Sequence, residues 1–263
     1  MSIKKLSEIN LDEIIKDKKY FKSPVAWEDQ VFYFLLVDRF SDGNEIGYIN
    51  IEGNAVNTGK TPLYNSVDYE NAVSNEIEAK AWRDSGDKWV GGNLRGIISK
   101  IGYLKRLGIT AIWLSPVFKQ VAYKETYHGY GIQNFLEIDP HFGSKEDLKE
   151  LVKVSHDNGI YVIMDIILNH TGDVFCYAPD QNTNHDKNST NISHPIWSGQ
   201  KHPVAGFYKA DGKGILPFEK INCDDSDGSF PNDDAIWPQE FQDPSYYTCK
   251  GHITYWDNNP EYT

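Results

Sequence analysis

Three apolar runs, separated by two amphipathic segments, organise the first two-thirds of the chain. The runs cover residues 31–37, 109–114 and 160–168 and consist mainly of aliphatic and aromatic residues. Near-continuous apolar runs are typical of parallel strands that are buried on both faces. The segments 93–107 and 144–159 place their apolar side chains three and four residues apart, as in an amphipathic helix. The order strand, helix, strand, helix, strand predicts an α/β fold.

Local signals mark where both predicted helices begin and end. Ser144 is a predicted N-cap with Asp147 three residues later, and Gly108 follows the first helix as a C-terminal glycine does. Three such strands begin either a doubly wound parallel sheet or a (β/α)₈ barrel, and the periodicity fits both.

The two ends of the chain lack this alternation of apolar runs and amphipathic segments. Residues 1–30 read as a leader with a loosely helical period that ends at Pro24. Residues 171–263 contain 11 Asp, 8 Asn, 7 Gly and 8 Pro, which favour turns, together with 14 aromatic residues. This composition predicts a loop-rich excursion after the third strand that still packs or binds something, since a disordered tail would lack the rings.

Charge and aromatic content narrow the class of ligand. The chain carries 26 Lys and Arg against 38 Asp and Glu, a formal net charge of −12. This balance argues against nucleic-acid binding, because phosphates would be repelled, and favours a neutral substrate or cations. Aromatic residues make up 13% of the chain, which suits either a sugar-binding cleft or a tyrosine-rich core.

The sequence predicts a cytoplasmic protein with no membrane partner. No stretch approaches the roughly 18 apolar residues of a membrane helix, and the first ten residues lack the apolar core of a secretory signal. The three cysteines, Cys176, Cys223 and Cys249, are widely spaced, which indicates reduced thiols rather than a disulfide framework or a metal site.

Polar residues end the third apolar run. Asp165 and Asn169 are expected on one face of the strand, with His170 at its carboxyl edge, where active sites of parallel α/β folds lie. An aspartate inside an apolar strand is costly unless it has a hydrogen-bond partner. Taken alone, the pattern also fits a strand end with a loop cap.

Four ordered blocks make the reading specific: VFYFLLVDRFSDGN at 31–44, GGNLRGIISKIGYLKRLGITAIWLSPVF at 91–118, YHGYGIQNFLEIDPHFG at 127–143 and MDIILNH at 164–170. Together they resemble the α-amylase family (glycoside hydrolase family 13) over residues 25–175. Residues 171–263 resemble the family's variable domain B, inserted after the third barrel strand. The resemblance implies that residues 31–170, after the leader over 1–30, form the first three strands of a (β/α)₈ barrel, and that the family member cleaves α-glucosidic bonds with retention.

The resemblance also implies roles for residues at the strand ends. Tyr130 resembles the tyrosine that stacks on the sugar at the cleavage subsite, and His170 resembles the histidine that hydrogen-bonds a hydroxyl of that sugar. His128 matches a further sugar contact, although a purely structural hydrogen bond is an equal alternative. Asp165 resembles the aspartate that braces the strand end.

A structural calcium ion is the implied cofactor. Asn169 resembles one of its ligands, and calcium needs 6–8 oxygen donors, for which Asp173, Asp180, Asp224, Asp225 and Asp227 are available. A second calcium loop found in some members would use Asp42, Asn44, Gly91 and Asn93. The family often has aspartate where this chain has Asn93, so a plain turn at 42–44 is the alternative reading.

The catalytic carboxyl groups of the family are not found in this sequence. The family nucleophile lies in a Gly-x-Arg-x-Asp motif, and residues 171–263 contain no arginine. We therefore assign no catalytic residue and expect an N-terminal fragment that binds α-glucan or oligosaccharide poorly and cleaves nothing; which glucan the family member acts on stays open. The alternatives are a non-catalytic carbohydrate-binding or interaction module, and an unrelated metal-dependent hydrolase using His128, His170 and Asp165.

Overall fold

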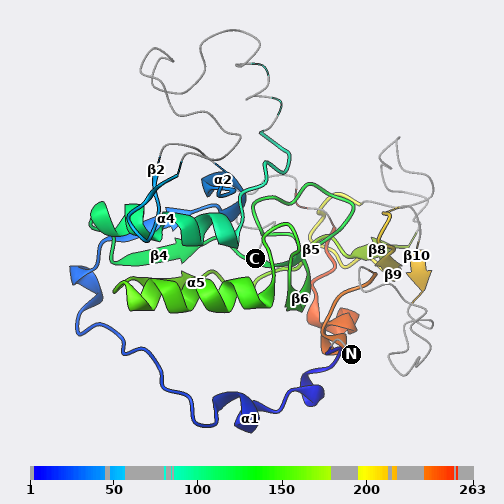
Figure 1. Ribbon diagram of the computed structural model, residues 1–263. Coiled ribbons are helices and arrows are strands. Elements are labelled where there is room, and N and C mark those ends of the chain that lie inside the picture. The colour runs from blue at the N-terminus through cyan, green and yellow to red at the C-terminus, as the bar shows by residue number, and fades with distance from the viewer. Residues whose placement is uncertain are drawn as a thin grey trace.

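A three-stranded parallel sheet forms the centre of the structure. The computed structural model describes residues 3–44, 48–56, 80, 84, 86–178, 195–212, 215–217, 234–251 and 253. The strands are β1 (Phe32–Leu35), β4 (Ala111–Leu114) and β7 (Tyr161–Met164), arranged in the order β1-β4-β7 (Figure 1). All pairs are parallel, and in register Phe34 lies opposite Trp113, which lies opposite Ile163. The predicted α/β fold is confirmed.

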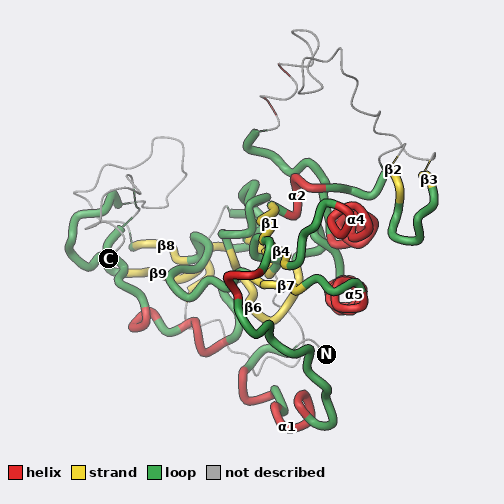
Figure 2. Tube along the Cα trace, turned by 90° about the vertical axis from the view of Figure 1, so that its left-hand side faces the viewer, coloured by secondary structure: helices red, strands yellow, loops and turns green. Residues whose placement is uncertain are grey.

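Two helices cover the same face of this sheet. They are α4 (Leu94–Arg106) and α5 (Lys145–Asp157), which pack side by side (Figure 2). The Asn93 side chain caps α4 by accepting from the Gly96 N–H, and Ser144 and Asp147 form a capping box on α5. Both helices therefore lie where the apolar period and the caps predict them. Their apolar faces meet the sheet in one buried cluster that includes Leu35, Leu94, Ile97, Ile101, Ile112, Leu114, Phe142 and Leu151.

The opposite face of the sheet is open to solvent. Phe32, Phe34 and Trp113 on that face are 47%, 48% and 42% exposed. The prediction that the strands are buried on both faces is thus wrong for the described residues, because both helices lie on one side. An exposed apolar face is what three strands of a larger parallel sheet leave uncovered.

Two apolar runs stop being strands earlier than their composition suggests. The first run turns after Leu35 into the short helix α2 (Val37–Phe40). The third run leaves the ladder after Met164, and residues 165–169 are irregular. The alternation that would place Asp165 and Asn169 on one strand face therefore does not apply.

The leader is mostly irregular and exposed. It contains η1 (Leu6–Glu8), α1 (Leu11–Ile15) and η2 (Trp27–Asp29), so the loosely helical period yields only short turns and helix α1 ends well before Pro24. Its start lies beside η4 (Gln239–Gln242), where the Leu6 N–H donates to the Glu240 carboxylate (Figure 1).

The described residues after β7 include a second sheet, which is antiparallel. Strands β8 (Phe175–Tyr177), β9 (Val204–Tyr208) and β10 (Ile215–Pro217) pair antiparallel in the order β10-β9-β8. Its apolar cluster comprises Val121, Val174, Phe207, Leu216, Ala235 and Ile236. The remaining elements are the hairpin β5 (Phe118–Gln120) and β6 (Ile132–Ile138), the small pair β2 (Tyr48–Ile49) and β3 (Ala55–Val56), and η5 (Pro244–Tyr246).

The cysteines and the membrane-spanning potential of the helices can be described for part of the chain. Cys176 and Cys249 are buried free thiols, and burial raises the pKa of Cys176 to about 12; Cys223 lies outside the described residues. Within the described part of the chain, no helix combines the length and apolar character needed to cross a membrane.

Candidate functional site

A pocket of about 650 Å³ lies between the end of the parallel sheet and the antiparallel sheet. Its lining includes His128 and Tyr130 from the loop that joins β5 to β6, together with Asn169 and His170 from the segment after β7. The lining also includes the aromatic residues Phe175, Tyr177, Trp197, Tyr246 and Tyr247. Four residues that the sequence singles out from two distant segments therefore share one cavity.

Tyr130 stands at the centre of a hydrogen-bonded group. Its phenol donates to Oδ2 of Asp165 at 3.0 Å, and its backbone N–H donates to Nδ1 of His128 at 3.0 Å. The Nε2 atom of His170 lies 3.1 Å from the Tyr130 carbonyl oxygen. Asp165 therefore holds the phenol of Tyr130, and its predicted role of bracing the strand end stays a prediction.

The hydrogen bonds fix the tautomers of both histidines. A carbonyl oxygen only accepts, so Nε2 of His170 must carry a proton. Nδ1 of His128 accepts from a backbone N–H and must therefore be unprotonated. Burial and the neighbouring His170 both lower the pKa of His128, which favours this neutral form. Burial, and then the bond to Asp165, raise the pKa of Tyr130, so the phenol stays protonated and donates.

This geometry predicts that the Tyr130 turn loosens in acid. The pKa of His128 is lowered from 6.5 in the folded chain, so the unfolded chain binds more protons and the stability that neutral His128 provides is lost as the pH falls from 6.5 through the folded pKa. We expect an NMR titration of the His128 imidazole to give a midpoint below 6.5, and His128→Gln to reduce the acid sensitivity of the unfolding temperature.

A matched control separates His128 from another partly buried histidine. Burial also lowers the pKa of His156, which lies on α5, stacks on Phe21 at a ring-centroid distance of 4.1 Å and does not line the pocket. His156→Gln should reduce the acid sensitivity of stability without changing the backbone signals of residues 129–131. If His128 titrates above 6.5, the proposed acceptor role of its Nδ1 is wrong.

The described residues do not by themselves form the calcium site implied at Asn169. Asp173 lines the same pocket, but its Oδ2 atom lies 2.7 Å from Nζ of Lys124, whose positive charge opposes a second cation there. The other candidate ligands, Asp180, Asp224, Asp225 and Asp227, lie outside the described residues. One amide and one carboxylate that is already paired fall short of the 6–8 oxygen donors of calcium.

The second calcium loop is built as a turn with a helix cap. Oδ1 of Asp42 accepts from the Asn44 N–H at 2.8 Å. The only side-chain oxygen of Asn93 accepts from the Gly96 N–H, and its amide donates to the Gly91 carbonyl oxygen at 3.2 Å. These bonds account for the turn and the helix cap, and a calcium ion held by Asp42, Asn44, Gly91 and Asn93 stays a prediction from the sequence.

The zinc-hydrolase alternative finds no support in the geometry. His128 and His170 each direct a ring nitrogen at the backbone of Tyr130, and a carboxylate oxygen of Asp165 holds the Tyr130 phenol. Within the described ranges, no group of three or more His, Cys, Asp and Glu side chains could hold a metal ion.

Two contacts near the site are missed by sequence reasoning. The buried carboxamide of Gln120 bonds to the backbone on both sides of Tyr130, and Lys124 pairs with Asp173, which also lines the pocket. A polar side chain directly before the buried Val121 is the only local signal for Gln120. Its partners lie 9 and 11 residues away, so spacing alone does not indicate them.

The fold and the pocket together define an α/β protein with a pocket rich in aromatic residues beside the end of its parallel sheet. The family model for the alpha amylase catalytic domain matches residues 34–250, and the chain therefore belongs to the alpha-amylase family. The resemblance drawn from the four sequence blocks is confirmed.

Individual relatives agree with this assignment. Alpha-amylase 2 of Dictyoglomus thermophilum is 31% identical over 224 residues, which cover 84% of this chain and 32% of that protein. Beta/alpha-amylase of Paenibacillus polymyxa is 35% identical over 147 residues, or 56% of this chain and 10% of that protein. The chain thus spans a third or less of the length of these curated relatives. A crystal structure of an Anoxybacillus alpha-amylase is 36% identical, with a TM-score of 0.39, and the match covers 57% of this chain and 26% of that one.

Proposed function

We propose that this chain is the sugar-orienting part of an α-amylase-type glycoside hydrolase that cleaves α-glucosidic bonds with retention. In this proposal residues 31–170 provide the first three strands of a (β/α)₈ barrel, and residues 171–263 a domain B-like insertion. The nucleophile and the acid/base lie in polypeptide outside these 263 residues. The observation that carries the proposal is the convergence of Tyr130 and His170 on one aromatic pocket, with Asp165 bracing the tyrosine.

The chemistry of the pocket suits a glucose unit. A pyranose ring has apolar C–H faces and a rim of hydroxyls. The ring of Tyr130 and the other aromatic residues of the pocket lining offer apolar surface for those faces. His170 and Asn169 supply polar groups at the same edge for hydroxyls. Neutral groups are appropriate for an uncharged ligand, which agrees with the neutral form of His128.

The open sheet supports a larger barrel. Phe34 and Trp113 pack edge to face at a centroid distance of 5.3 Å on the face that the helices leave uncovered. In a closed barrel the inward side chains of neighbouring strands fill the interior. Additional strands beside β1 and β7 would bury this apolar face and pair both sheet edges. Calcium at Asn169 and a cytoplasmic location remain predictions that rest on the sequence.

The test is a combined binding and turnover assay of the chain with maltoheptaose and starch. We expect no release of reducing ends above background, because retaining cleavage needs two carboxyl groups about 5–5.5 Å apart and the chain has no Gly-x-Arg-x-Asp motif. NMR titration with maltoheptaose should give weak binding that perturbs Tyr130 and His170.

A matched pair of tyrosine variants makes this test specific. Tyr130→Ala should weaken maltoheptaose binding about tenfold, the effect of losing about 1.4 kcal/mol of ring contact. Tyr103 lies on α4, is 47% exposed and does not line the pocket, so Tyr103→Ala should leave binding unchanged. Turnover well above background, or equal effects of the two variants, would contradict the proposal.

A second candidate is a non-catalytic carbohydrate-binding module of the same fold. The observation that favours it is that the pocket is formed within this chain. The affinity for maltoheptaose discriminates between the two functions. Micromolar binding without turnover supports the module, whereas millimolar binding supports an enzyme part that lacks the remaining subsites.

A further inference from the structure

Side chains supply most of the hydrogen bonds that hold the turn carrying Tyr130. All six backbone polar groups of residues 129–131 have partners: Thr126 O, His128 Nδ1, His170 Nε2, Val121 N–H and the two ends of the Gln120 carboxamide. Gln120 alone serves two of these groups, one on each side of Tyr130. It is also the member of this set that lies outside the pocket lining.

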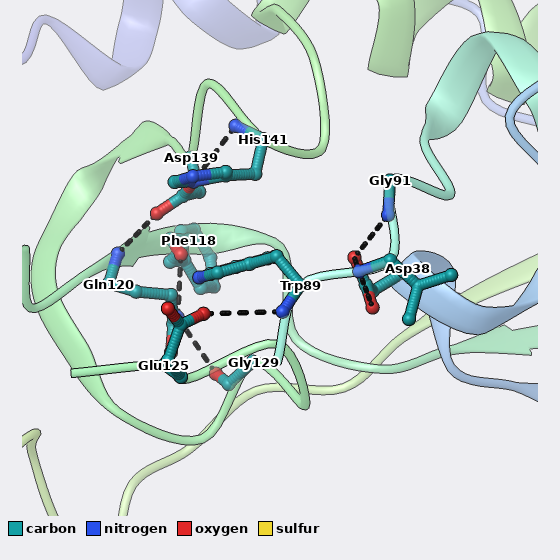
Figure 3. A network of polar contacts seen from close by, with 10 residues as sticks. Asp38, Trp89, Gly91, Phe118, Gln120, Glu125, Gly129, Asp139 and His141 are labelled. Carbon is teal, nitrogen blue, oxygen red and sulfur yellow. Dashed lines mark hydrogen bonds and ion pairs between the residues drawn. The ribbon is translucent and has the colours of Figure 1, made fainter. Parts of the chain in front are cut away.

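The Gln120 side chain is fixed at every atom that can hydrogen-bond. It is 3% exposed, and Nε2 donates to the carbonyl oxygens of Phe118 at 2.7 Å and Gly129 at 2.9 Å (Figure 3). Oε1 accepts from the Gly131 N–H at 2.8 Å. The backbone N–H of Gln120 donates to the buried carboxylate of Asp139 at 2.8 Å, which fixes the position of the residue itself.

We propose that Gln120 is a positioning residue, whose buried carboxamide clamps the peptide groups on both sides of Tyr130 and thereby orients the Tyr130 ring and His170 toward a sugar. The site requires two donors and one acceptor within one planar group, and among side chains of this length a carboxamide provides them. A carboxylate would face two carbonyl oxygens without a proton to share. A leucine would fill the space and leave the Gly129 and Gly131 peptide groups unsatisfied.

We expect the position of Tyr130 to depend on this clamp, because the Gln120 carboxamide holds the peptide groups on both of its sides. Its carbonyl accepts from His170, and its phenol reaches Asp165, so a rotation of the turn moves both contacts together. Releasing the Gly129 and Gly131 peptide groups therefore displaces the ring and the imidazole without altering either side chain. The link to sugar binding rests on the proposed function, whereas the clamp itself does not.

The test compares Gln120→Leu with Gln133→Leu in the full chain. Gln133 is an equally buried glutamine, 2% exposed on β6, and its Nε2 donates to Asp234 O and Ala235 O rather than to the Tyr130 turn. Nitrogen-15 NMR of the imidazoles reports the hydrogen bonds at His128 and His170, and titration with maltoheptaose reports affinity. We expect Gln120→Leu to shift both imidazole signals and to weaken binding about fivefold, and Gln133→Leu to do neither.

The outcomes separate the clamp from the proposed function. Unchanged imidazole signals in Gln120→Leu, or equal shifts in Gln133→Leu, would overturn the positioning role. Shifted signals in a chain that never binds maltoheptaose would support the clamp and reject the sugar site. If Gln120→Leu does not fold, hydrogen exchange in the wild-type chain tests the proposal instead. The Gln120 carboxamide protons should exchange far more slowly than those of exposed Gln200. Equal exchange rates would overturn the proposal.

Discussion

Replacing Gly129 by alanine is expected to destabilise the chain by about 3 kcal/mol and to disrupt the Tyr130 turn. Gly129 has φ +87°, a left-handed conformation that alanine adopts only at a cost. A Cβ atom there would also lie 2.1 Å from the carbonyl oxygen of Pro116, well inside contact distance. The neighbouring atom belongs to the backbone, so the overlap can be relieved only by moving the turn or the strand-end segment.

Gly108 provides the matched control for this substitution. It has the same φ of +87°, and a Cβ atom at Gly108 would meet nothing within 4 Å. Gly108→Ala should therefore cost only the conformational penalty, about 1 kcal/mol. Urea unfolding of the two variants measures the difference, which isolates the steric overlap. Equal losses of unfolding free energy in both variants would show that the Pro116 contact is not limiting.

The sequence indicates the parts of the fold that depend on local signals. The capping residues Asn93 and Ser144 and the apolar period between caps fix α4 and α5 within their own segments, so both helices are predicted closely. The strand ends are less predictable because apolar runs continue past them. Residues 37–40 form helix α2 and residues 165–168 leave the ladder although their composition is strand-like.

The candidate site likewise contains residues that the sequence indicates and contacts that it does not. Tyr130 and His170 are identified because they fall in blocks with family resemblance, and both line the pocket. The hydrogen-bond partner of the partly buried Asp165 carboxylate is Tyr130, 35 residues earlier, and no spacing rule connects the two. Gln120, Lys124 and the orientation of His128 depend on how the β5–β6 loop folds back on itself. Such contacts arise from tertiary structure and are visible only in three dimensions.

Asp38→Ala is expected to lower the free energy of unfolding by about 3 kcal/mol. Asp38 is 1% exposed, and its Oδ1 accepts from the Val90 N–H at 3.0 Å and the Gly91 N–H at 2.9 Å (Figure 3). Arg39 Nε lies 3.4 Å from its Oδ2. The alanine variant lacks the carboxylate that accepts from the Val90 and Gly91 N–H groups. It also lacks the negative charge beside the Arg39 guanidinium. The segment 86–93 would then lose the carboxylate that binds its backbone to α2.

The effect should reach the pocket side of the molecule through Trp89. The Trp89 N–H donates to Oε2 of Glu125 at 3.2 Å, and its ring stacks on His141 at a centroid distance of 4.0 Å, so segment 86–93 also contacts the loop that leads to Tyr130 (Figure 3). Hydrogen exchange in Asp38→Ala should accelerate at Trp89, Val90 and Gly91.

Asp42→Ala is the control for this prediction, because Asp42 lies in the next turn and its Oδ1 accepts from a single backbone N–H, that of Asn44. We expect a loss of about 0.5–1 kcal/mol there. Asp38→Asn should fall between the two alanine variants, since a carboxamide keeps one acceptor oxygen for Val90 and Gly91 but has no negative charge for Arg39. Equal urea midpoints for Asp38→Ala and Asp42→Ala would show that the buried carboxylate does not hold segment 86–93.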